Sequence, residues 1–205
     1  MLRRLLGPPA LLALLALGGC DRQPAPMGAS GAGSASQITE RVLRRGHGGE
    51  PGSLDPQRAQ DHYAYEIQRD LYEGLTSEAV DGSVVPGVAE RWTVSPDGLV
   101  YRFELRESAR WSDGSEVRAE HFVAAYRVAV DPATVSPAAE MLHAIVNARH
   151  ILEGRAPPDE LGVRAVGPRD LEITLEHPVP FFLSLLTHPV FYPRHPAPPA
   201  AGGVG

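Results

Sequence analysis

The chain has 205 residues, of which 43% are hydrophobic and 21% charged, and its 19 basic and 25 acidic side chains give a formal net charge of −6. This balance argues against a nucleic-acid partner, because proteins that bind phosphate backbones need an excess of Lys and Arg. The single cysteine excludes an internal disulfide, so a folded body must depend on an ordinary hydrophobic core.

The amino terminus has the pattern of an exported lipoprotein. Two arginines precede an apolar run over 5–17, and a Gly-Gly pair leads directly to Cys20. The run is shorter than the roughly 20 apolar residues that span a bilayer, so it predicts a cleaved signal peptide over 1–19. Small residues before the cysteine suit signal peptidase II, which would leave Cys20 diacylated and the protein anchored to a membrane.

An ordinary cleaved signal with an incidental cysteine is the alternative for this segment. Asp21 follows the cysteine, and in lipoproteins of Gram-negative bacteria an acidic residue there is associated with retention in the inner membrane. We therefore expect a periplasmic protein anchored to the inner membrane. Without Arg3 and Arg4 the chain has 17 basic and 25 acidic residues, a net charge of −8. Segment 20–36, rich in small residues and Pro, predicts a flexible tether.

Strand signals are clearest over 89–105. Trp92 and Val94 lead into a Ser-Pro-Asp-Gly turn at 95–98, and the returning strand alternates apolar with charged residues. The apolar members of that strand are Tyr101, Phe103 and Leu105. The pattern predicts a β-hairpin with one buried and one solvated face.

Helical spacing follows a second turn at 112–114. Residues 119–130 place apolar side chains on one face and stop at an Asp-Pro pair, which predicts an amphipathic helix. Similar spacing from about 138 to 152, ending before Gly154, predicts a second helix. The apolar positions are Phe122, Val123, Tyr126, Ala129 and Val130 in the first helix, and Met141, Leu142, Ile145, Ala148 and Leu152 in the second.

Alternation returns beyond these helices. Residues 163–166, a turn at 167–170 and residues 171–175, in which apolar residues alternate with Glu172 and Thr174, predict another hairpin, and 181–186 predict a short helix. After Tyr192 the chain has no strand or helix pattern. This mixed order predicts an α+β domain rather than a repeated βαβ array.

Together these motifs resemble family 5 of the bacterial solute-binding proteins, in its oligopeptide-binding group. Their order and spacing match the family over residues 37–196. The motifs are Glu50 with Ser53 to Pro56, Asp70 to Leu75, Pro86 to Glu90 with Trp92, Arg110 to Gly114, Phe122, Asp131 to Pro137, Ile151 to Gly154, Leu161 to Val163 and Pro178 to Pro189.

The resemblance implies a periplasmic-binding-protein-like type II fold that is present only in part. Residues 37–72 would begin domain I, residues 73–196 would form the β-rich domain II, and 197–205 would be an unstructured tail. Family members continue for more than twice this length, so the second lobe would be absent. We interpret the chain as an N-terminal fragment that arose by truncation or a frameshift.

The resemblance also implies a monomeric receptor that binds extended oligopeptides non-covalently and delivers them to an inner-membrane ABC permease. It implies no enzymatic activity, cofactor or metal. Family members grip the peptide main chain partly from a loop that corresponds here to Gln60, Asp61 and His62, and a second contact comes from an aromatic ring at the position of Ala138. The family often has an acidic residue in place of Gln60 and an aromatic one in place of Ala138. Plain surface loop is the alternative for these positions.

Other conspicuous residues fit structural roles. Trp92 and Trp111 lie at strand or turn edges, where packing is the common role of Trp. His143 and His150, seven apart on the second predicted helix, give too few ligands for a zinc site. No serine lies in the glycine frame of a nucleophile elbow. The alternative function is a lipid-anchored extracytoplasmic interaction domain without transport activity.

Overall fold

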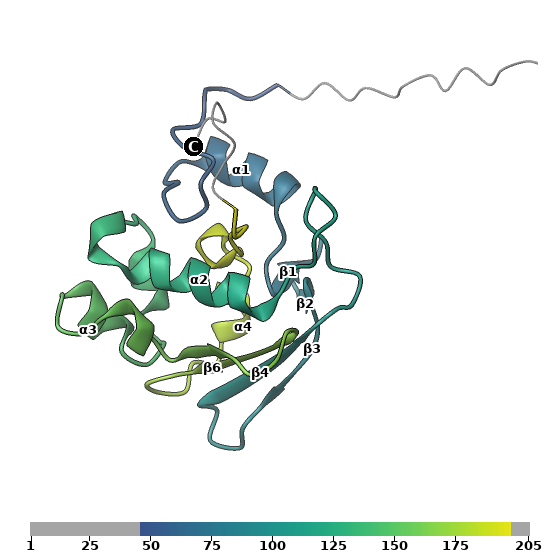
Figure 1. Ribbon diagram of the computed structural model, residues 1–205. Coiled ribbons are helices and arrows are strands. Elements are labelled where there is room, and N and C mark those ends of the chain that lie inside the picture. Colours follow the sequence, from purple (N-terminus) through teal and green to yellow (C-terminus); the bar gives the residue numbers. More distant parts are fainter. Residues whose placement is uncertain (1–45, 198–205) are drawn as a thin grey trace, which may run out of the picture. The chain divides into compact units, whose positions relative to one another are not determined.

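The computed structural model describes residues 46–197, so the predicted signal peptide, the tether and Cys20 lie outside the described residues (Figure 1). The described part contains both helices and strands, as the sequence predicts. In chain order these are α1 (His62–Leu71), β1 (Thr76–Glu78), β2 (Val84–Pro86), β3 (Ala89–Val94), β4 (Val100–Leu105), α2 (Ala119–Val130), the 3-10 helices η1 (Pro132–Thr134) and η2 (Ala139–Leu142), α3 (Ala148–Leu152), η3 (Pro158–Glu160), β5 (Val163–Ala165), β6 (Asp170–Thr174), α4 (Phe182–Leu185) and η4 (Pro189–Phe191).

A four-stranded antiparallel sheet in the order β3-β4-β6-β5 forms the base of the fold. Both predicted hairpins are confirmed, as β3-β4 and β5-β6. The turn between β3 and β4 places Gly98 at φ 71°, a left-handed conformation that glycine adopts without strain. Cross-strand pairs such as Phe103 with Leu171 and Tyr101 with Ile173 put the alternating apolar residues on one face of the sheet.

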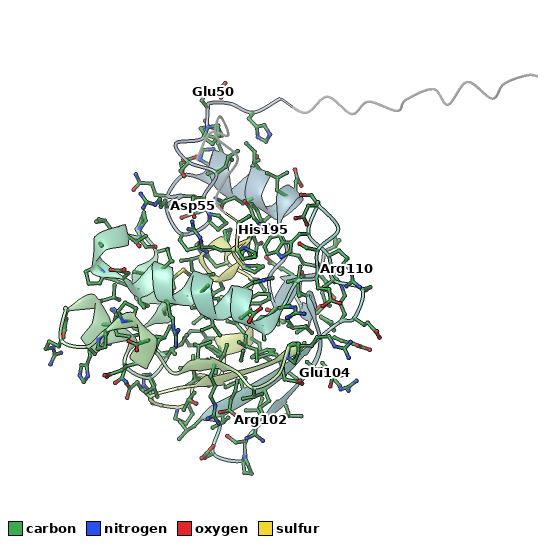
Figure 2. All side chains as sticks on the ribbon, in the orientation of Figure 1. Glu50, Asp55, Arg102, Glu104, Arg110 and His195 are labelled. Carbon is green, nitrogen blue, oxygen red and sulfur yellow. The ribbon has the colours of Figure 1, made fainter. Side chains whose placement is uncertain are left out.

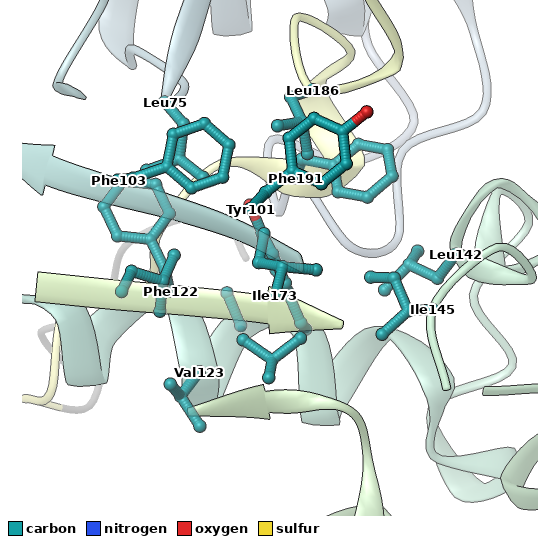
Figure 3. Close-up of a cluster of buried hydrophobic side chains, with 14 of the residues drawn as sticks. Leu75, Tyr101, Phe103, Phe122, Val123, Leu142, Ile145, Ile173, Leu186 and Phe191 are labelled. Atoms are coloured by element: carbon teal, nitrogen blue, oxygen red, sulfur yellow. The ribbon is translucent and has the colours of Figure 1, made fainter. Parts of the chain in front are cut away.

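The core lies between that face of the sheet and α2. The predicted helix 119–130 is confirmed, and its apolar positions are all buried. Figure 3 shows Phe103, Phe122 and Ile173 together in this cluster, each with 1% or less of its surface exposed. Full burial of one such side chain stabilises the fold by roughly 1.5–3 kcal/mol, so the hydrophobic effect dominates here. In Figure 1, α2 lies between the sheet and α1.

The prediction of one continuous helix over 138–152 is wrong. The segment forms η2 and α3, and Asn147 at φ 66° separates them. The interruption arises because the N–H of Val146 donates to the carbonyl of Thr174 (3.0 Å), while its own carbonyl accepts from the N–H of Gly162 (2.9 Å). These bonds extend the sheet by a short segment. The apolar spacing fits a helix equally well, because the same side chains are buried in either conformation.

Glu172 alternates with the apolar residues of β6, and yet only 5% of its surface is exposed. It lies on the outer face of β6, where Arg102 of β4 and Arg164 of β5 each donate from Nε to its carboxylate at 2.8 Å. The Arg102 hydrogen bond is the largest of the effects that hold the pKa of Glu172 below its ordinary value. The two long arginine side chains, themselves mostly exposed, cover the carboxylate.

A second, two-stranded sheet of β1 and β2 has no counterpart in the sequence-based prediction. Each strand is only three residues long, which is too short for an alternating pattern to be visible. The segment leading into β1 passes very close to other parts of the chain. A Cβ on Gly74 would lie 2.8 Å from the carbonyl oxygen of Leu186, so glycine is required at this crossing.

Candidate ligand-binding region at the start of the first helix

The predicted ligand-contacting residues 60–62 lie where the two ends of the described chain meet. Gln57, fully buried, donates from Nε2 to the carbonyls of Val190 (3.3 Å) and Tyr192 (3.1 Å), which are 133 and 135 positions away. Arg194 donates from Nη1 to the carboxylate of Asp55 (2.9 Å) and to Oε1 of Gln57 (3.3 Å). We call residues 46–72 together with 188–197 the junction.

Figure 2 shows one residue from each end of the described chain, Asp55 and His195, between α1 and α2. The sequence did not indicate a role for Gln57 and Arg194, because the two residues stand far apart in the chain and neither belongs to a periodic pattern. The nearest signal is the Asp-Pro pair at 55–56, which marked the segment without indicating its partner.

Asp61 caps the first helix. Its Oδ1 accepts from the N–H of Ala64 (2.8 Å) and its Oδ2 accepts from the N–H of Gly52 (3.0 Å). These backbone hydrogen bonds, that of Ala64 first, lower the pKa of Asp61 below its ordinary value and keep the carboxylate ionised. An N-cap carboxylate both satisfies a free amide and interacts favourably with the helix dipole. The side chain of Asp61 therefore fixes the loop that contains Gln60.

Gln60 and His62 are exposed on either side of this cap. The ring of His62 packs on that of Tyr63, with ring centroids 3.8 Å apart. Neither the backbone N–H nor the backbone carbonyl of Gln60 makes a hydrogen bond within the described residues. The main chain at Gln60 thus has one donor and one acceptor available, on a segment held in place by the neighbouring cap.

Ala138 lies on a different element, at the start of η2. It is partly buried against the core, and its carbonyl accepts from the N–H of Met141 (3.0 Å). No hydrogen bond or ion pair connects Ala138 with residues 60–62 within 46–197. The structure therefore brings Gln60, Asp61 and His62 together and leaves Ala138 as a separate position that presents only a methyl group.

A cluster of rings supports the junction from the side of the β-rich part. Trp111 donates from Nε1 to Nδ1 of His121 (3.1 Å), which also accepts from the N–H of Arg118 (3.1 Å). Burial lowers the pKa of His121, with a smaller contribution from His195 and Arg118. His195 packs edge-on against Trp111, and its Nε2 lies 3.2 Å from the carboxylate of Asp113.

The tryptophans have the structural roles that the sequence indicates, since both Trp92 and Trp111 pack against the core. His143 and His150 lie on either side of the break at Asn147, so they share no helix face. Among the described residues, no group of three His, Cys, Asp or Glu side chains is placed to hold a metal ion. No helix within 46–197 is long and apolar enough to cross a membrane.

A hollow of about 310 Å³ lies beside the junction, between α1, β1 and the segment before η4. Its lining is mainly polar and consists of Arg69, Tyr72, Glu73, Ser77, Glu78, Thr187 and Tyr192. Several of these groups already have partners, because Arg69 lies 3.7 Å from Glu78 and Glu73 accepts from Arg106. This volume is at the lower limit of small-molecule pockets. It is too small to enclose an extended peptide.

Comparison with known proteins identifies similar sequences and structures. Residues 83–203 match the family model described as bacterial extracellular solute-binding proteins, family 5, middle. The chain is 43% identical over 164 residues to the periplasmic oligopeptide-binding protein OppA of Escherichia coli K12, an alignment that covers 79% of this chain and 30% of OppA. It is also 43% identical over 156 residues to the probable deoxycholate-binding periplasmic protein YgiS of the same organism, covering 75% of this chain and 29% of YgiS.

A solved structure agrees with these matches. The Escherichia coli murein tripeptide binding protein MppA superposes with a TM-score of 0.69 at 42% identity, covering 71% of this chain and 29% of MppA. The neighbours are type II periplasmic-binding proteins, so the predicted partial α+β fold is confirmed. The chain spans about 30% of the length of the curated relatives that it matches.

Proposed function

The chain belongs to family 5 of the bacterial extracellular solute-binding proteins, and we propose that it takes part in binding oligopeptides for import by an inner-membrane ABC permease. Members of this family bind solutes rather than catalyse reactions. Two of its relatives are named for oligopeptides or a murein tripeptide, which supports a peptide as the ligand.

The observation that carries this proposal is the free main chain at Gln60. A receptor that accepts many sequences grips an extended peptide through backbone hydrogen bonds and leaves the side chains in tolerant surroundings. Gln60 offers an N–H and a carbonyl that no described residue uses, and the Asp61 cap next to it fixes their direction. Because a preorganised loop has little conformational entropy to lose, such a site binds at a low entropic cost.

Asp61, His62 and Ala138 have different parts in this proposal. Asp61 positions the loop, since both carboxylate oxygens accept backbone N–H groups of the chain itself. The exposed ring of His62 is available to a ligand side chain. Ala138, the N-cap residue of η2, offers a small surface on which a ligand can lie without a specific contact.

Titration calorimetry of the full chain with short peptides tests the proposal. Gln60→Pro removes the backbone donor, whereas the matched variant Gln60→Ala removes only the side chain. We expect Gln60→Pro to weaken peptide binding about tenfold, the loss of one well-placed hydrogen bond, and Gln60→Ala to bind like the wild type. Thermal melting of both variants controls for loss of the fold.

Two results would contradict peptide binding. A chain that folds cooperatively but releases no heat with any peptide would support the alternative, a lipid-anchored interaction domain without transport activity. Heat with deoxycholate but with no peptide would indicate a ligand of the kind for which YgiS is named. The chain is 43% identical to YgiS, as it is to OppA. Equal affinities of Gln60→Pro and Gln60→Ala for peptides would remove Gln60 from the site.

We further propose that Cys20 is diacylated, that the protein is a monomer anchored to the inner membrane and facing the periplasm, and that residues 37–72 and 73–196 belong to domains I and II. Cys20 after a short apolar run supports the anchor. Radiolabelled palmitate should be incorporated into the wild type and not into Cys20→Ser. Incorporation into Cys20→Ser as well as the wild type would contradict the anchor. A wild type that is as soluble without detergent as Cys20→Ser would contradict it too.

A further inference from the structure

The hollow between α1, β1 and the segment before η4, about 310 Å³ in volume, has no part in the proposed function. Its lining includes Arg69, near the C-terminal end of α1, whereas Gln60 precedes the N-terminal end of that helix. The helix rises roughly 10 Å between His62 and Arg69. A ligand in the hollow would therefore be separate from a peptide held at Gln60.

Two opposite charges at the hollow lie close together without a hydrogen bond. Nη2 of Arg69, on α1, is 3.7 Å from Oε2 of Glu78, on β1. This separation exceeds the roughly 2.7–3.2 Å of an N–H···O hydrogen bond, and neither side chain makes another hydrogen bond within residues 46–197. The two side chains are 56% and 49% exposed, and an exposed ion pair of this kind contributes little to stability. Both charged groups are thus available to a ligand.

The third charged residue of the lining is already satisfied. Glu73 accepts from both Nη1 and Nη2 of Arg106, a bidentate pair that leaves little capacity for a ligand. The charges that remain available are one guanidinium, of Arg69, and one carboxylate, of Glu78, and they sum to zero. A ligand with a net charge would pair with one of them and leave the other without a partner. A zwitterion pairs with both.

Uncharged groups complete the lining. The rings of Tyr72 and Tyr192 are stacked, with centroids 6.3 Å apart and 24° between their planes, and both contribute aromatic surface to the hollow. The hydroxyl of Tyr192 donates to the carbonyl of Thr187 (3.3 Å), whereas those of Tyr72 and Ser77 make no hydrogen bond within the described part. Burial raises the pKa of Tyr72, so its hydroxyl stays protonated and can donate.

We propose that this hollow binds a free α-amino acid, with its carboxylate on Arg69, its ammonium on Glu78 and its side chain beside the two tyrosine rings. The inference goes beyond the proposed function and does not depend on it. The two charged groups of an α-amino acid are bonded to the same carbon atom, which suits protein groups of opposite charge only 3.7 Å apart. The volume of the hollow, too small for an extended peptide, suits a ligand of this size. Because the lining comes from α1, β1 and residues 187–192, a bound amino acid connects three segments and stabilises the fold.

The test measures binding of leucine to the full chain by calorimetry. It is repeated with leucinamide, which lacks the carboxylate, and with N-acetyl-leucine, which lacks the ammonium. We expect each analogue to bind at least about tenfold more weakly than leucine, because one charge-assisted contact is lost. Leucine should also raise the melting midpoint of the chain. The analogues probe the site in the wild type, so this result does not depend on the fold of a variant.

Substitutions test the two charged residues. Arg69→Gln and Glu78→Gln should each weaken leucine binding about tenfold. Arg155→Gln is the matched control, because Arg155 and its partner Glu153 are exposed to a similar extent, 59% and 48%, and lie outside the hollow. It should leave the affinity for leucine unchanged. Saturating Ala-Ala-Ala should not displace leucine, since the two ligands would occupy separate sites.

Three results would overturn the inference. The first is leucine that gives neither heat nor a shift of the melting midpoint. The second is an equal affinity for leucine and its two analogues, or for the wild type and both hollow variants. The third is displacement of leucine by Ala-Ala-Ala, because leucine would then occupy the proposed peptide site. The first two leave the proposed function intact, since titration with peptides decides that question separately, and the third supports it.

Discussion

The β-rich body, residues 73–187, and the junction are held together by different interactions. In the body, the sheet and α2 bury side chains that are almost all apolar, such as Phe103, Phe122 and Ile173. In the junction, buried Gln57 and the Arg194–Asp55 pair connect segments that are far apart in sequence. The body is therefore stabilised mainly by the amount of apolar surface buried, and the junction mainly by a few oriented polar contacts.

The body and the junction should therefore respond differently to substitutions. Apolar burial is non-directional and tolerates small displacements, whereas a buried amide that loses its partner costs its full desolvation free energy. The proposed ligand-contacting residues 60–62 lie in the junction, where geometry depends on such oriented contacts. Substitutions at matched buried and exposed positions in each region test this account.

The largest effect is expected for Phe122→Ala in the body. Phe122 is fully buried between α2 and the sheet, so truncation removes apolar contacts and leaves a cavity. The free energy of unfolding should fall by about 3–5 kcal/mol, measured by urea denaturation. Phe181→Ala is the control, because Phe181 is 61% exposed and should lose less than about 1 kcal/mol. Similar losses for the two variants would contradict an apolar core at this position.

The next effect is expected for Gln57→Leu in the junction. Leucine is similar in size but cannot donate to the carbonyls of Val190 and Tyr192 or accept from Arg194. Arg194 keeps its bond to Asp55, but the carbonyls of Val190 and Tyr192 lose their donor, which should lower the free energy of unfolding by about 2–3 kcal/mol. Gln60→Leu, at an exposed position, should change it by at most about 0.5 kcal/mol. A neutral Gln57→Leu would mean that burial, and not hydrogen bonding, holds the junction together.

These two regions also differ in how well the sequence predicts them. In the body, the alternation Tyr101-Phe103-Leu105 and the helical spacing from Phe122 to Val130 predicted both hairpins and α2, because side-chain periodicity is a local property. The prediction of a continuous helix failed at Asn147, and the sequence did not indicate the burial of Glu172, because partners from other strands decide the conformation or the burial.

The candidate site shows the same limit. Asp61 was predicted from the family resemblance as a contact for the ligand main chain, but in the structure it caps α1. Its bond to Ala64 is the local N-cap pattern, whereas no pattern reveals the approach of Gly52, nine positions earlier. Gln57 and Arg194 carry no sequence signal at all, since their contact spans 137 positions. Long-range polar contacts depend on the complete fold, so they cannot be predicted from local patterns in a single sequence.

A smaller effect, dependent on pH, is expected where the two regions meet. The pKa of His121 is lowered, mainly by burial, so the folded state favours the neutral ring, whose Nδ1 accepts from Trp111 and Arg118. Because the folded pKa lies below the ordinary 6.5, this stability is present above pH 6.5 and is lost as the pH falls through the folded pKa. The melting midpoint should therefore decrease on acidification from pH 7.5 to 5.

His121→Asn separates this contribution from those of other groups, including His188, whose pKa burial also lowers. Asn can place its side-chain oxygen near the position of Nδ1 and does not titrate in this range. Its melting midpoint should decrease less between pH 7.5 and 5 than that of the wild type. An identical change of the melting midpoint with pH in the two proteins would show that protonation of His121 does not contribute to the loss of stability on acidification.

The smallest effect is expected for Gln68, which does not follow the rule that buried polar groups in the junction are hydrogen-bonded. It is fully buried on α1 in the junction, yet neither atom of its side-chain amide has a hydrogen-bond partner among the described residues. If oriented polar contacts stabilise the junction, an amide without them should destabilise it, so Gln68→Met should raise the free energy of unfolding by about 1 kcal/mol. Ile67→Met, the neighbouring position, controls for the effect of methionine in this helix. If Gln68→Met instead lowers the free energy of unfolding, an ordered water or another segment is bonded to the amide. The junction would then contain a further polar contact of the same kind as that of Gln57.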